Sequence, residues 1–140
     1  MTSTIFYIFL FIHLVSLIVG FGAVVVIDTV GLLWLRKKVK LAFVTQVAGI
    51  TQRLIWIGWF GLVISGTVLL GLKGWPLSDL TKLKLFLVAM LGANGIFLHF
   101  IKKEFELGRV PLGRMTLATI ISQIGWWGAM IIGFLNTNVL

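Results

Sequence analysis

The chain has 140 residues, of which 59% are hydrophobic and 11% are charged, and its mean hydropathy is +1.11. Soluble domains contain roughly 45–50% apolar residues, so this composition excludes an ordinary soluble domain and predicts an integral membrane protein. The net charge of +8 does not indicate a nucleic-acid partner, because most basic residues fall in two short segments between apolar runs.

The first apolar run covers about residues 5–35 and is long enough to cross a bilayer as a helix. We expect it to remain in the mature protein, because no basic residue precedes it and no cleavage site of small residues follows its apolar core. His13 and Asp28 lie within this run. Ionisable groups at membrane depth are costly and usually face a bundle interior or one another, so both residues are candidates for function.

Three further apolar runs cover about residues 43–72, 80–101 and 115–135. The second carries Arg53, and the third begins near Lys84 and ends near His99. Each run also has two small residues four positions apart, which favours close helix packing in lipid. These pairs are Ser16/Gly20, Gly61/Ser65, Ala89/Ala93 and Gly125/Ala129. The predicted fold class is all-α: one integral membrane domain over residues 1–140, folded as an antiparallel four-helix bundle.

Eight of the twelve basic residues lie in the two segments that follow the first and third runs. Short loops rich in Lys and Arg face the cytoplasm, so both termini are predicted outside the inner cell membrane. These segments should also attract anionic lipid, by about 1 kcal/mol for each basic residue near the surface. The eight residues are Arg36, Lys37, Lys38, Lys40, Lys102, Lys103, Arg109 and Arg114.

Two membrane histidines suggest a b-type haem held by two imidazoles, but their depths oppose a shared iron. His13 lies 22 residues before Leu35, or about 33 Å, whereas His99 lies two residues before Ile101, or about 3 Å. A gap of about 30 Å cannot be bridged within one protomer. Only a homo-oligomer with crossed protomers, or two separate sites, would use both histidines.

The same depths group the ionisable residues into two layers. Lys84 lies about 25 Å from the cytoplasmic edge, so its long side chain could reach the level of His13. Asp28 and Arg53 lie near the cytoplasmic half, where they could form an ion pair that fixes helix register. With His99, they could instead form a proton or ion relay. The simpler alternatives to a functional role are that His13 is a packing residue and that the Lys84 side chain extends to the membrane interface.

Three segments resemble one superfamily of four-helix membrane proteins. They are "FIHLVSLIVGFGA", "RLIWIGWFGLVISGTVLL" and "KLKLFLVAMLGANGIFLH". They are similar to the copper-resistance D proteins and to the membrane protoporphyrinogen oxidases of the HemJ type. His13, Gly22, Arg53, Gly66 and Lys84 match the short motifs of these families. The resemblance implies a four-helix membrane fold and a site in its outer half that contains His13 and Lys84.

Three functions remain open. The protein could be a haem-associated oxidoreductase, in which His13 binds iron and Lys84 ligates it or pairs with a haem propionate. It could be a transport component for a metal ion or proton, since neutral imidazole suits copper and zinc. Copper is the weaker cofactor candidate, because the chain has two histidines, no cysteine and four dispersed methionines. It could also be a non-catalytic subunit or scaffold.

Overall fold

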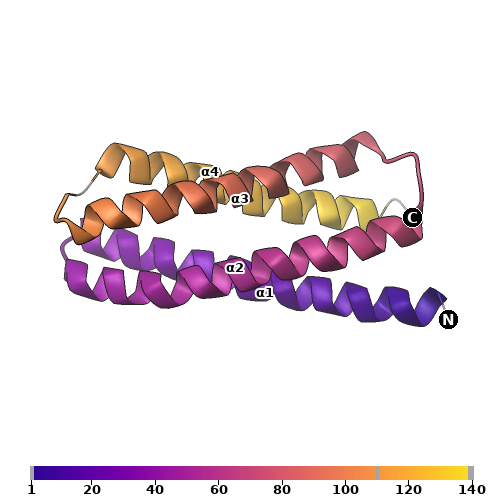
Figure 1. Ribbon diagram of the computed structural model, residues 1–140, viewed down its shortest axis with the longest axis horizontal. Coiled ribbons are helices and arrows are strands. Elements are labelled where there is room, and N and C mark those ends of the chain that lie inside the picture. The colour runs from indigo at the N-terminus through magenta and orange to yellow at the C-terminus, as the bar shows by residue number, and fades with distance from the viewer. Residues whose placement is uncertain (1, 110, 139–140) are drawn as a thin grey trace. The chain divides into compact units, whose positions relative to one another are not determined.

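The computed structural model describes residues 2–109 and 111–138, and all regular structure within them is helical (Figure 1). The four helices are α1 (Thr2–Leu35), α2 (Leu41–Lys73), α3 (Asp79–Glu106) and α4 (Leu112–Asn138). Each is long and apolar enough to cross a membrane. The prediction of an all-helical chain with four candidate membrane spans is therefore confirmed.

The helices extend beyond the apolar runs that predicted them, most clearly at the end of α3. Residues 102–106 continue the helix because Lys and Glu are good helix formers. The helix then ends in a Schellman motif, with Gly108 at φ +77°. The Arg109 N–H donates to the Glu104 carbonyl and the Gly108 N–H donates to that of Phe105, both at 3.0 Å. An apolar run thus marks the lipid-facing part of a helix better than it marks the helix end.

The chain divides into two compact units, residues 1–75 and 76–140, and each is a helical hairpin. In the first hairpin, His13 lies opposite Ser65 and Gly20 lies opposite Gly58. Residue numbers rise along α1 as they fall along α2, so these two helices are antiparallel. The second hairpin follows the same rule, because Lys84 lies against Gly133 and Leu91 lies against Gly125.

Small residues bring α1 and α2 into backbone contact. A Cβ atom added to Gly58 would lie 2.5 Å from Gly20 Cα and 2.7 Å from the Ser16 carbonyl oxygen. A Cβ on Gly61 would overlap the Ser16 side chain. The predicted rows Ser16/Gly20 and Gly61/Ser65 are thus confirmed as the contact between these helices, where close approach replaces the hydrophobic drive that lipid does not supply.

The contact between α3 and α4 is built differently. Leucine side chains of α3 pack onto glycines of α4, so that a Cβ on Gly125 would lie 2.6 Å from Leu91 Cδ2. Gly125 is therefore at the helix contact, as predicted. Ala89 and Ala93 are exposed, so this pair does not make the contact between α3 and α4. Large side chains of one helix fill the space that small residues of the other leave open.

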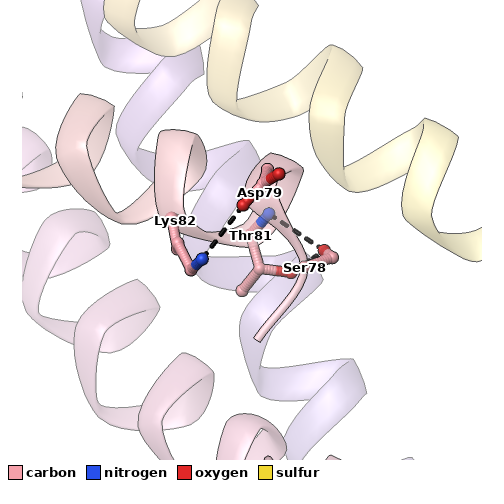
Figure 2. A network of polar contacts seen from close by, with 4 residues as sticks. All are labelled: Ser78, Asp79, Thr81 and Lys82. Atoms are coloured by element: carbon pink, nitrogen blue, oxygen red, sulfur yellow. Dashed lines mark hydrogen bonds and ion pairs between the residues drawn. The ribbon is translucent and has the colours of Figure 1, made fainter. Parts of the chain in front are cut away.

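The start of α3 is fixed by a capping network that the sequence "LSDLTK" encodes (Figure 2). The Ser78 Oγ accepts a hydrogen bond of 3.2 Å from the Thr81 backbone N–H, which satisfies one of the unpaired donors of the first turn. The Asp79 carboxylate forms a 3.0 Å ion pair with Lys82 and lies at the positive end of the helix dipole. The network therefore fixes the first turn of α3, and Lys84 lies in the second turn.

The other ends of the hairpins carry basic residues. Lys37 has φ +58° and ends α1, with the Lys38 N–H donating to the Leu33 carbonyl at 2.9 Å. In the second hairpin, the Arg114 guanidinium binds both carboxylate oxygens of Glu104, at 2.7 and 2.8 Å. This bidentate pair joins the end of α3 to the start of α4.

Candidate functional site

His13 is held by a hydrogen-bonded chain that crosses the first hairpin. Its Nδ1 lies 2.8 Å from the Ser65 Oγ, and Ser65 has no exposed surface. The Ser65 hydroxyl donates its only proton to the Gly61 carbonyl, one turn earlier on α2. The serine oxygen must then accept from His13, so Nδ1 carries the proton. A neutral His13 therefore has its lone pair on Nε2, which is the nitrogen that a metal would bind.

The imidazole of His13 packs against α2 at Gly66. A Cβ on Gly66 would lie 3.4 Å from His13 Cε1 and 3.7 Å from Nδ1, which is ordinary van der Waals contact. The ring therefore lies close to the backbone of α2 and is half-buried. Packing against one helix and a hydrogen bond to that helix together fix the ring orientation.

Lys84 is placed by the second hairpin. Its Nζ lies 3.4 Å and its Cε 4.0 Å from the position that a Cβ on Gly133 would occupy, so the side chain lies against α4. At the same end of this hairpin, the Asn136 amide lies 3.5 Å from the Thr81 hydroxyl. Lys84 thus lies six residues after Ser78, near the end of the second hairpin where α3 begins.

His13 and Lys84 belong to different hairpins, and their joint site stays a prediction. Each can be placed along its own hairpin from the segment 74–78 that joins the two. Ser65, the partner of His13, lies nine residues before Gly74, or about 13 Å. Lys84 lies six residues after Ser78, or about 9 Å. Both residues therefore lie toward the same connecting segment.

The register of the first hairpin brings Asp28 and Arg53 to similar levels. Asp28 lies opposite residue 50, three residues or about 4.5 Å from the level of Arg53. However, Arg53 is exposed and lies between about 80° and 140° around α2 from the row of Gly58, Gly61 and Ser65. Its guanidinium would have to reach around α2 to meet Asp28. The ion pair stays a prediction.

His99 lies in the second hairpin, on an exposed part of α3. Its ring makes an edge contact with Phe100, with centroids 6.3 Å apart. Among the residues that the structure describes, no three His, Asp or Glu side chains are grouped closely enough to hold a metal ion.

We expect Asp28 and Arg53 to act as a unit. Asp28→Asn and Arg53→Gln should each lower the free energy of unfolding by more than the double variant does, because one charge left alone in the membrane costs more than none. A thermal-unfolding cycle in detergent measures the coupling. Additive effects would mean that the two side chains do not interact.

The contact of the candidate site that sequence reasoning missed is the one between Ser65 and His13. The spacing of Ser65 from Gly61 indicated only helix packing, and 52 positions separate Ser65 from His13. The signal that could have found it is the antiparallel register, which places the start of the first run opposite the end of the second.

No family model, curated protein or solved structure matches this chain.

Proposed function

We propose that the protein is a haem-associated membrane oxidoreductase in which His13 Nε2 binds the iron of a b-type haem. The observation that supports this most directly is the chain from His13 Nδ1 through Ser65 Oγ to the Gly61 carbonyl. Histidines that bind metals usually donate their other ring N–H to a neighbouring acceptor, which fixes the tautomer and the ring plane. A single histidine is sufficient to hold haem iron.

The donor set fits such a group. His13 supplies one neutral nitrogen, and Lys84 supplies a cation suited to a propionate carboxylate. When bound, haem would supply one-electron chemistry that the side chains lack. The protein's own residues would bind and orient it: Ser65 holds the imidazole, the ring packs against α2 at Gly66, and the lysine lies against α4 at Gly133.

The test begins with the absorption spectrum of the protein purified from membranes after expression with haem supplied. A Soret band is expected. If the band is absent, transport of copper or protons is measured in proteoliposomes. Transport that is lost in His13→Ala would favour a transport component. Absence of the band without any transport would favour a scaffold.

Ser65→Ala should keep the Soret band but raise the reduction potential of the haem. Without an acceptor at Nδ1–H, the imidazole becomes less basic and stabilises ferric iron less. Redox titration measures the shift. Thr67→Ala is the matched control, because Thr67 also donates to the carbonyl four residues earlier but is exposed. Equal haem reduction potentials in Ser65→Ala and Thr67→Ala would show that Ser65 does not act on the haem ligand.

We further propose that the two hairpins form one antiparallel four-helix bundle in the inner cell membrane, with both chain termini outside. The basic segments support this orientation, because the ends of the hairpins at Arg36–Lys40 and Lys102–Arg114 would then face the cytoplasm. Arg36, Lys37 and Lys38 are exposed at the end of α1 and are suited to anionic lipid headgroups.

Cysteine labelling tests the orientation cleanly, because the native chain contains no cysteine. A membrane-impermeant maleimide added outside should modify Ser3→Cys and Trp75→Cys, since Trp75 is 83% exposed in the segment that joins the hairpins. Lys38→Cys and Leu107→Cys should be protected until the membrane is opened. The opposite pattern would invert the proposed topology.

A further inference from the structure

A buried asparagine lies in the middle of α3, away from the residues of the proposed haem site. Asn94 is 15 residues after Asp79 and 12 before Glu106, and only 6% of its surface is exposed. Its side-chain Nδ2 donates a 2.9 Å hydrogen bond to the Ala118 carbonyl of α4. This bond fixes the amide orientation, because a reversed amide would place its oxygen against the carbonyl oxygen.

The other half of the Asn94 amide has no partner. Its Oδ1 is buried and makes no hydrogen bond with any residue that the structure describes. Buried polar atoms in native proteins are almost always hydrogen-bonded, and an unpaired acceptor is most costly within a membrane span, where lipid offers no donor. An occupant that donates a hydrogen bond is therefore expected at this oxygen.

The register of the second hairpin shows which residues of α4 are level with Asn94. Leu87 lies against Gly128 and Leu91 against Gly125, so Asn94 is level with Ser122 on α4. Ser122 is 8% exposed and lies one turn from Ala118, which is fully buried. The amide oxygen of Asn94, the hydroxyl of Ser122 and the carbonyl of Ala118 thus gather at one level. A buried water needs two to four polar partners of this kind.

We propose that α3 and α4 hold a water molecule in the middle of the membrane span, bound between Asn94 Oδ1 and Ser122 Oγ. The water donates one hydrogen to the amide oxygen and bonds the serine hydroxyl, while Nδ2 keeps its bond to Ala118. One turn away the two helices are in close contact, since a Cβ on Gly125 would lie 2.6 Å from Leu91 Cδ2.

The proposal does not depend on haem, since neither Asn94 nor Ser122 is a residue of the proposed haem site. Solid-state NMR on the full protein in lipid vesicles tests it by transferring magnetisation from water to carbon. The Asn94 Cγ should receive water magnetisation much faster than the backbone carbonyl carbon of Leu91, which is buried one turn away. Equal and slow transfer at the two carbons would show that no water is bound and would overturn the proposal.

Two variants of α4 test whether Ser122 is the second hydrogen-bond partner of the water. Ser122→Ala should largely remove the fast transfer at Asn94 Cγ, because the water loses its partner on α4. Thr119→Ala is the control on the same helix, since Thr119 is exposed, and it should leave the transfer unchanged. Fast transfer that survives in Ser122→Ala would overturn the proposed bridge between the helices.

Discussion

Haem binding should be lost when His13 is replaced by alanine, while the protein still folds. The substitution removes the nitrogen that is proposed to bind iron. It also removes the hydrogen bond to Ser65, worth about 1 kcal/mol. Ser65 keeps its bond to the Gly61 carbonyl, so no buried hydroxyl is left unsatisfied. The absorption spectrum and the yield of monodisperse protein together measure this separation of binding from folding.

His99→Ala is the matched control for this experiment. It removes the chain's other histidine, which is exposed and lies in the second hairpin. Its Soret band should remain at wild-type intensity. If the band instead survives in His13→Ala and disappears in His99→Ala, the ligand belongs to α3. Loss in both single variants would point to iron shared between the two histidines.

The four helices were predictable because each depends on a local property of the chain. An apolar run of sufficient length must satisfy its backbone within itself in lipid, which leaves a helix as the solution for each run. The contact between α1 and α2 was also predictable. Ser16 and Gly20 repeat at helical spacing, and so do Gly61 and Ser65, so their small side chains lie on one face.

The candidate site was only partly predictable, because it depends on which residues of two helices face each other. His13 was identified by its cost in a membrane, but its bond to Ser65 follows from the hairpin register. Ala89 and Ala93 have the same spacing as the small residues of α1, yet they are exposed. Lipid is as apolar as the interior of a helix bundle, so hydropathy does not distinguish the packed face of a membrane helix from its lipid face.

Gly58→Ala should destabilise the first hairpin far more than Gly66→Ala or Gly71→Ala. The added methyl group would meet backbone atoms of Gly20 and the Ser16 carbonyl at 2.5 to 2.7 Å. Overpacking costs about 1–3 kcal/mol where side chains can adjust. Here no side-chain rotation relieves the overlap, so we expect a loss at or above the upper end of that range. Reversible unfolding in mixed micelles measures it.

Gly71→Ala provides the control on the same helix, because a Cβ there meets nothing within 4 Å. It should be neutral or slightly stabilising, since alanine is the better helix former by about 1 kcal/mol. Gly66→Ala should fall between the two, because its methyl group only touches the His13 ring. Separating α1 from α2 at Gly58 would also draw His13 away from Ser65, so Gly58→Ala should weaken haem binding as it weakens the fold. If Gly58→Ala were as stable as Gly71→Ala, the two helices would not meet at Gly20, and the register that pairs His13 with Ser65 would be wrong.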